Sequence, residues 1–295
     1  MSKVGFIGLG IMGGHMAANL VKAGYEVMAF DVVPAAVERA VSNGCVGCMS
    51  IKEVAEACDD IITMLPNSPH VKSVVLGEGG VAQYAKKGTL IIDMSSIAPG
   101  ASKEMQKALE EKGILMIDAP VSGGEPKAAD GTLAIMVGGE EVNFERAKKY
   151  FDILGSSAVL VGPIGSGNTC KLTNQMIVAV NIAVLAEGLQ LATRAGADAE
   201  KVFNAIKGGL AGSTVMNAKA PMMLDGNFKP GFKIDLHIKD LTNALETGYA
   251  TNTPMPLTAD VMQMFQVLKA DGCGQDDHSG LMKYYEKLTG TEVRR

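Results

Sequence analysis

Three glycines near the N-terminus have the spacing of a nucleotide-binding turn. Gly8, Gly10 and Gly13 form a G-x-G-x-x-G pattern. Such glycines permit a tight turn and let a pyrophosphate approach the N–H groups that begin the next helix. The pattern alone is weak because glycine-rich turns are common, but here a β-branched run precedes it and a helical pattern follows. The predicted cofactor contacts of this turn are Gly8, Gly10, Ile11, Met12 and Gly13.

An acidic residue follows at the distance expected for a ribose contact. Asp31 ends the next β-branched run, about 20 residues after the glycines as the motif requires. A carboxylate there can accept hydrogen bonds from both adenosine ribose hydroxyls and would repel a 2′-phosphate. The residues that follow, Val32 to Pro34, include no arginine. We therefore expect NAD(H) to be favoured over NADP(H).

Two further loops follow predicted strands, which is where doubly wound sheets bind their ligands. The first loop is Met64–Asn67 and the second is Asp93–Ser96. Pro, Asn and Ser are also ordinary turn residues, so turn formation alone is the alternative interpretation. Given the nucleotide motif, the predicted cofactor contacts of these loops are Leu65, Pro66, Asn67, Ser95 and Ser96.

Up to about residue 162, short β-branched runs alternate with helical patterns. Nearly continuous apolar strands in this alternation predict a parallel sheet with helices on both faces, an α/β fold of the Rossmann doubly wound type. The predicted strands are Val4–Gly8, Glu26–Asp31, Asp60–Leu65, Thr89–Met94, Leu115–Ala119, Leu133–Val137 and Val159–Val161. The predicted helices between them include Met12–Ala23, Ala35–Ser42 and Ser102–Lys112.

After Gly165 helical periodicity dominates to the end of the chain. The first helix of this region is long, roughly 45 Å, and its apolar residues run almost all the way round, which favours burial by its own domain and by a second subunit. This predicts an NAD(P)-binding domain at 1–162 and an all-α substrate and dimerisation domain at 163–295, built on a long interdomain helix. The predicted helices are Ser166–Ala195, Ala199–Gly208, Ile234–Ala250, Thr258–Ala270 and Asp276–Leu288.

Composition and charge exclude several classes of protein. Of the 295 residues 47% are hydrophobic and 20% charged, and 27 basic against 32 acidic residues give a net charge of −5. With no basic run, nucleic acid and anionic membranes are poor partners. The longest charge-free apolar stretch, Leu172–Ala186, is shorter than the about 20 residues of a membrane span. No signal peptide is predicted, so a soluble cytoplasmic protein is expected.

The cysteines and histidines do not predict a metal site. Five cysteines, an odd number, favour a reducing compartment over a disulfide framework. Cys45 and Cys48 form a C-x-x-C pair but lack a second pair or histidines at ligand spacing, so we interpret them as small buried residues. His237 is predicted to be a packing or hydrogen-bonded histidine rather than an acid–base group. We expect metal-free chemistry.

Residue type and position alone assign no clear function to three polar residues and one glycine-rich turn. Lys171 and Asn174 share one face of the long helix, where a lysine at the start is usually a surface residue. Lys239 stands beside Asp240, which usually indicates a solvated face. In the turn Asp118–Gly124, N–H groups and small side chains suit an anion such as a carboxylate, and a turn without a ligand is the alternative.

These segments together resemble the β-hydroxyacid dehydrogenases over essentially the whole chain. The matching segments, in family order, are Gly5–Gly13, Asp118–Gly124, Gly165–Asn174 and Lys239–Leu241. The resemblance implies that Lys171 is the catalytic general acid and base and that Asn174 orients it or binds the substrate hydroxyl. It further implies that Lys239 reaches the cofactor end of the active site. The implied substrate-binding residues are Ser122, Gly123, Gly124, Lys171 and Asn174.

Three segments narrow the expected reaction within the family. Leu65–Val71, Gly208–Ser213 and Phe228–Phe232 resemble the members of the family that reduce 2-hydroxy-3-oxopropionate to glycerate. This resemblance implies that reversible reaction, and Asp31 predicts NADH as its cofactor. The alternative within the family is 3-hydroxyisobutyrate or another short β- or γ-hydroxyacid. The alternative of another class is a catalytically inactive, nucleotide-binding interaction protein, which the retained Lys171, Asn174 and Lys239 disfavour. The resemblance implies a homodimer or homotetramer.

Overall fold

The N-terminal part of the chain is built on one mostly parallel sheet. The computed structural model describes residues 2–295. The strand order is β3-β2-β1-β4-β5-β6-β8-β7, with β9 beside β8, and its first six strands follow the order of nucleotide-binding sheets. The strands are β1 (Lys3–Ile7), β2 (Glu26–Phe30), β3 (Val46–Gly47), β4 (Asp60–Thr63), β5 (Leu90–Asp93), β6 (Leu115–Asp118), β7 (Val121–Ser122), β8 (Leu133–Gly138) and β9 (Gly155–Gly162).

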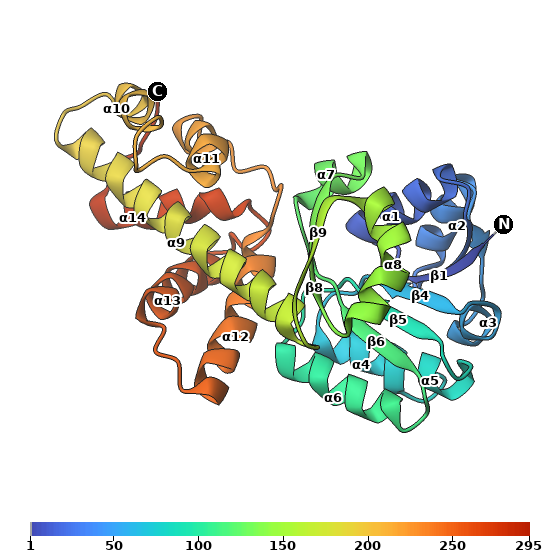
Figure 1. Cartoon of the computed structure of the whole chain (residues 1–295). Helices are drawn as coiled ribbons and strands as arrows, with labels where there is room; N and C mark the ends of the chain where they lie inside the picture. Colours follow the sequence, from blue (N-terminus) through green and yellow to red (C-terminus); the bar gives the residue numbers. More distant parts are fainter. Residues whose placement is uncertain (1) are drawn as a thin grey trace. The chain divides into compact units, whose positions relative to one another are not determined.

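Helices cover both faces of this sheet, as the nearly continuous apolar strands predict (Figure 1). One buried layer includes Met16, Leu20 and Tyr150, and the other includes Val54, Val75 and Leu109. The first layer lies under α1 (Ile11–Lys22), α2 (Pro34–Ser42), α7 (Gly124–Asp130) and α8 (Glu141–Leu154). The second lies under α3 (Ile51–Ala57), α4 (Ser68–Leu76), α5 (Val81–Tyr84) and α6 (Pro99–Glu110). The predicted Rossmann-type class is confirmed.

The sheet departs from the predicted strands in three places. It is not parallel throughout, because β8 runs antiparallel to both β6 and β7. The two-residue strands β3 and β7 were not predicted, since two residues are too few to show a hydrophobic period. Strand β9 is longer than the predicted Val159–Val161, and its alternating burial hides its polar first half from a search for apolar runs.

The long predicted helix is α9 (Ser166–Arg194), a single helix of 29 residues. By its contacts the chain divides into two compact units after Lys171, so the first turns of α9 belong to the first unit. The expected boundary at residue 162 coincides with the end of β9. By length and composition alone α9 is apolar enough to cross a membrane, and 44% of its most apolar window is buried within this chain. The core helix of a soluble protein has the same properties.

The second unit, from Leu172 onward, consists of helices around one apolar core. Phe265, Leu241 and Ile182 are among its fully buried side chains. Two predictions were incomplete here. Helix α11 was missed because Pro221 interrupts its pattern, and Asp276–Leu288 is a 3-10 turn followed by a short helix. The further elements are α10 (Ala199–Ile206), α11 (Thr214–Leu224), α12 (Ile234–Thr251), α13 (Pro256–Ala270), η1 (His278–Leu281) and α14 (Met282–Thr289).

Candidate active site

The glycine turn between β1 and α1 has the geometry of a nucleotide cradle. Gly8 has a φ of +100°, and a Cβ there would lie 2.3 Å from the Met64 carbonyl oxygen. A Cβ on Gly13 would lie 1.9 Å from the Gly8 carbonyl oxygen, so neither position admits a side chain. Gly10, by contrast, faces open space at the start of α1. Gly8 and Gly13 make the turn possible, and Gly10 leaves the outer side of the turn open for a pyrophosphate.

Asp31 has a structural role that was not predicted. Its Oδ2 accepts a hydrogen bond from the Leu9 N–H at 2.7 Å, and its Oδ1 accepts one from the Val33 N–H at 2.8 Å. The carboxylate therefore ties the end of β2 to the glycine turn. Two carboxylate oxygens have about four acceptor positions, so capacity remains for ribose hydroxyls. The residues of the turn and Asp31 together fit a dinucleotide.

The two predicted cofactor loops are joined by a buried serine. The Ser95 hydroxyl accepts a hydrogen bond from the Leu65 N–H at 2.8 Å, which brings the loop after β4 against the loop after β5. Asn67 stands at the N-cap of α4. Ser95 is fully buried, so its observed function is to hold Leu65. Contact of these loops with the cofactor stays a prediction.

Asp93, the last residue of β5, carries a carboxyl group whose pKa lies well above its ordinary value. Burial raises the pKa of Asp93 to about 7, although Ser95 and Thr63 donate hydrogen bonds to it. Because the folded state holds this proton more tightly than the unfolded chain, the contribution of the group to stability is complete below about pH 4 and is lost as pH rises through about 7. We therefore expect the melting temperature of the wild type to fall as the pH rises from about 4 to about 7.

Asp93→Asn removes this titration and is expected to flatten the decline. The measurement is the melting temperature at several pH values, with the exposed Asp152→Asn as a control that keeps the wild-type slope. An equally steep decline in Asp93→Asn would show that the carboxyl group is not its source.

A second buried carboxylate fixes the start of α9. Asp118 accepts hydrogen bonds from the Gly165 N–H at 2.7 Å and from the Asn168 N–H at 2.6 Å. The Asn168 side chain in turn accepts from the Ile97 N–H at 3.0 Å and donates to the Ser102 hydroxyl at 3.2 Å. One carboxylate at the end of β6 thus anchors the first turn of the long helix.

Lys171 follows one turn after this anchored start. Its side chain is 6% exposed, whereas a lysine at the start of a helix is usually at the surface. Gly167 lets the first turn of α9 approach strands β6 and β8 closely. A Cβ at this position would lie 2.5 Å from the Met136 carbonyl oxygen and 2.6 Å from that of Asp118. Lys171 is therefore largely desolvated, a position where lysines rarely occur without a functional or paired role.

The predicted carboxylate loop begins at the same residue, Asp118. Ser122 ends β7 and pairs with Ala134 of β8. Gly123 and Gly124 follow with φ values of +142° and +68°, conformations that only glycine adopts readily. A Cβ on Gly123 would lie 2.6 Å from Lys127 Cδ, whereas a Cβ on Gly124 would have no atom nearer than 3.8 Å. Binding of a substrate carboxylate by this loop stays a prediction.

Two residues that the sequence analysis did not select connect Asn174 to Lys239 in the second unit. The Gln175 Nε2 donates to Asp240 Oδ2 at 2.6 Å, and the Asn174 Nδ2 donates to Gln175 Oε1 at 2.9 Å. Lys239 Nζ lies 3.0 Å from Asp240 Oδ1. A signal was present in the sequence, because Gln175 stands four residues after Lys171 and so shares its helix face.

His237 is a buried, hydrogen-bonded histidine, which confirms the prediction. Its Nε2 lies 3.0 Å from the Gln175 carbonyl oxygen and its Nδ1 lies 3.0 Å from His278 Nδ1. Phe232 and Phe265 pack around the ring. Cys45 and Cys48 are also buried as predicted, and burial raises the pKa of the Cys45 thiol to about 11. Within residues 2–295 no group of three His, Cys, Asp or Glu residues is arranged to hold a metal ion.

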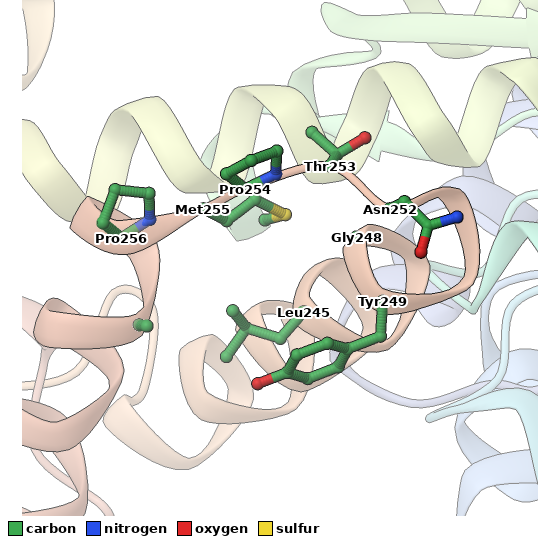
Figure 2. A pocket seen from close by; sticks show the side chains of 9 residues that line it. Leu245, Gly248, Tyr249, Asn252, Thr253, Pro254, Met255 and Pro256 are labelled. Atoms are coloured by element: carbon green, nitrogen blue, oxygen red, sulfur yellow. The ribbon is translucent and has the colours of Figure 1, made fainter.

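Two surface pockets in the second unit contain none of the predicted site residues. The first has a volume of about 530 Å³ and is lined by the end of α12, including Leu245 and Tyr249, and by the segment 252–256 (Figure 2). The second, of about 440 Å³, lies between that segment and the α9 residues Ile177 and Val184. Both are predominantly apolar in their lining and lack the polar groups of the candidate chemistry.

Comparison with known proteins identifies the family. Residues 3–162 match the family model for the NAD binding domain of 6-phosphogluconate dehydrogenase, and residues 165–285 match that for the NAD-binding region of NADP-dependent 3-hydroxyisobutyrate dehydrogenase. The chain is 45% identical to 2-hydroxy-3-oxopropionate reductase of Escherichia coli (strain K12), over 99% of each chain. It is 42% identical to 2-(hydroxymethyl)glutarate dehydrogenase of Eubacterium barkeri, over 99% of this chain and 97% of the relative.

A solved structure agrees with these matches. The 3-hydroxyisobutyrate dehydrogenase of Mycobacterium tuberculosis, solved with L-serine, superposes with a TM-score of 0.90 at 34% identity and covers 96% of this chain and 98% of its own. Fold, nucleotide cradle and relatives together define an NAD(P)-binding oxidoreductase that acts on hydroxyl groups. The chain belongs to the β-hydroxyacid dehydrogenase family.

Proposed function

We propose that this enzyme reversibly reduces 2-hydroxy-3-oxopropionate to glycerate with NADH. The observation that carries the proposal is the 45% identity, along nearly the whole of both chains, to a reductase named for that substrate. The buried Lys171 on an anchored helix start supports the chemistry. A role as a non-catalytic nucleotide-binding protein is disfavoured, since the relatives named above are enzymes.

The proposed roles follow from the chemistry of each group. NADH, when bound, supplies a hydride to the aldehyde carbon. The aldehyde oxygen then carries negative charge, and Lys171 donates a proton to it as the general acid. In the oxidation of glycerate the neutral lysine accepts the same proton. Ser122 and the N–H groups of Gly123 and Gly124 bind the substrate carboxylate, and Asn174 binds the hydroxyl or orients the lysine.

The test of the proposed substrate is a comparison of two aldehydes. Oxidation of NADH by the purified protein is followed with 2-hydroxy-3-oxopropionate and with 2-methyl-3-oxopropanoate, the oxo form of 3-hydroxyisobutyrate. A pocket that distinguishes groups of this size discriminates by about 1–3 kcal/mol, so we expect kcat/KM to differ about tenfold or more in favour of the first. The reverse preference would assign the enzyme to 3-hydroxyisobutyrate instead.

We propose NADH rather than NADPH because of the Asp31 carboxylate. Its negative charge lies where the adenosine ribose is expected, and it would repel a 2′-phosphate. We expect kcat/KM with NADH to exceed that with NADPH by about tenfold or more, and Asp31→Ser to reduce this ratio. Steady-state kinetics with both cofactors is the measurement. Equal use of both by the wild type would contradict the proposal.

We further propose that the second unit associates with a second copy of this chain through α9. Ile177, Val184 and Leu191 are spaced seven residues apart on this helix and are 58%, 61% and 70% exposed. A seven-residue apolar repeat is the pattern by which helices pair. Glu187 lies on the same face between Val184 and Leu191, where it accepts a hydrogen bond from the Tyr285 hydroxyl at 2.8 Å. The apolar groove beside Ile177 and Val184 continues the stripe. A second copy offers the same stripe and so matches it in length and polarity.

Val184→Lys is expected to dissociate this assembly, because it places a charge in the middle of the paired surface. Light scattering after size-exclusion chromatography should give at least twice the 30.8 kDa mass of the chain for the wild type and a single-chain mass for the variant. Val142→Lys, at an exposed position on α8, is the control and should leave the mass unchanged. A wild type of single-chain mass would contradict the proposal.

We propose a cytoplasmic location for this enzyme. All five cysteines are free, and three of them are buried, which fits a reducing compartment.

A further inference from the structure

We infer that Asp240 and Gln175 are positioning residues that set the orientation of the Asn174 amide and hold Lys239 beside it. This inference rests on the proposed function, in which Asn174 and Lys239 act in the active site. Neither Asp240 nor Gln175 was selected by the sequence analysis, and both lie among buried residues of the second unit.

The four residues form one continuous chain between two helices. Asn174 and Gln175 are neighbours on α9, and Lys239 and Asp240 are neighbours on α12. The links run from Lys239 to Asp240 at 3.0 Å, from Asp240 to Gln175 at 2.6 Å, and from Gln175 to Asn174 at 2.9 Å. A second contact holds the same place on α9, since His237 Nε2 lies 3.0 Å from the Gln175 carbonyl oxygen.

The negative charge of Asp240 determines which group donates and which accepts in each hydrogen bond from Asp240 to Asn174. An ionised carboxylate only accepts hydrogen bonds, so the Gln175 amide must turn its NH₂ group toward it. The Gln175 oxygen then faces Asn174, and the Asn174 NH₂ group donates a hydrogen bond to it. The Asn174 oxygen is thereby turned away from Gln175. The polarity of the chain therefore makes Asn174 present an acceptor, the group that suits a substrate hydroxyl or the ammonium group of Lys171.

Burial makes the arrangement rigid. Asp240 is 2% exposed and Gln175 is 5% exposed, so water does not compete for these hydrogen bonds. A buried carboxylate requires a cation or donors close by, and Lys239 supplies the positive charge. The same contact restricts the Lys239 side chain. The Asp240 carboxylate thus fixes both the neutral Asn174, through Gln175, and the charged Lys239.

A double-mutant cycle on Asp240 and Asn174 tests this inference. Asp240→Asn keeps the shape of the side chain but removes the charge, so both orientations of the Gln175 amide become possible. We expect kcat/KM to fall about 10- to 100-fold, as small misplacements of an active-site group do. In the Asn174→Ala background, where there is no amide to orient, Asp240→Asn should cost clearly less than in the wild type, because only its effect on Lys239 remains. Non-additivity of this kind is the signature of residues that act through one another.

Further measurements separate positioning from general destabilisation. The NADH dissociation constant and the melting temperature are determined for each variant, and Glu246→Gln, an exposed acidic residue on the same helix, is the control for loss of one charge. An equal loss from Asp240→Asn in both backgrounds, in an active wild type, would overturn the inference and leave the proposed function standing. A wild type with no turnover on any 3-oxo acid would instead overturn the proposed function, and the inference with it.

Discussion

Lys171→Met is expected to lower kcat about 10²- to 10⁴-fold, the usual contribution of a general acid. Methionine matches the length of the lysine stem, and the position is 6% exposed, so the apolar side chain fits without disturbing the fold. The proton that the new alkoxide requires is then no longer available from the protein. We expect the dissociation constant for NADH and the melting temperature to stay close to the wild-type values, and stopped-flow or steady-state NADH oxidation measures the loss.

Lys171→Arg separates proton transfer from charge. Arginine keeps the positive charge but is not deprotonated in proteins, so it stabilises an alkoxide without supplying a proton. We expect this variant to remain strongly impaired. Lys107→Met, which removes an exposed lysine on α6, is the matched control and should be fully active. Wild-type turnover by Lys171→Arg would show that the residue acts through its charge alone.

Asp277→Asn is expected to destabilise the second unit by about 3–5 kcal/mol, the cost of breaking a buried ion pair. Asp277 is fully buried and accepts hydrogen bonds from Lys219 Nζ at 2.9 and 3.1 Å. It also accepts from the backbone N–H groups of Gly231, Phe232 and Ser279 at 2.9 to 3.0 Å. The amide cannot accept at both ends, so Lys219 loses its counter-charge and one or more N–H groups lose their acceptor. Urea unfolding measures the loss.

The pH dependence gives an independent readout of the same carboxylate. Burial alone would raise the pKa of Asp277, but the charge of His278 and the hydrogen bonds from Lys219, Ser279 and Phe232 hold it at about 2. A lowered pKa stabilises the fold above the unfolded value near 4, and this contribution is lost as pH falls through about 2. The wild type should therefore lose stability between pH 4 and pH 2, and Asp277→Asn should lose less over that interval.

The neighbouring Asp276 provides the control for this prediction. Asp276 pairs with Lys283 at 2.7 Å, where both side chains are about one-third exposed, and exposed pairs contribute at most about 1 kcal/mol. A similar loss of stability in Asp276→Asn and Asp277→Asn would show that the buried network has no special weight. Asp277 also holds the segment before α12, the helix that carries Lys239 and Asp240, so reduced activity is expected to accompany reduced stability.

The sequence by itself determined the first half of the fold and its nucleotide turn. Apolar strands of four to five residues alternate with amphipathic helices there, and that period is a local property of the chain. The constraint on Gly13 is equally local, because it comes from the Gly8 carbonyl oxygen within the turn, whereas the constraint on Gly8 comes from Met64 in the loop after β4. The alternation of elements and the glycine pattern were nevertheless visible in the sequence without knowledge of the tertiary contacts.

Elements without a clear period were decided only in the folded chain. The strands β3 and β7 have two residues each and exist because a neighbouring strand offers its edge. The antiparallel direction of β8 follows from its pairing with β6 and β7, not from its composition. Helix α11 contains Pro221, which predicts a break, and it is held instead by buried Met216, Ala220 and Met223.

The residues that fix the proposed chemistry were hidden for the same reason. Asp118 bonds N–H groups 47 and 50 residues further along the chain, and Asp240 meets Gln175 across 65 residues. Only the resemblance to a family pointed to Lys171, Asn174 and Lys239, because residue type and spacing alone favoured a surface role for the two lysines. Asp118, Asp240 and Gln175 act through contacts between segments that are distant in the sequence. Such contacts exist only once the hydrophobic cores have brought those segments together.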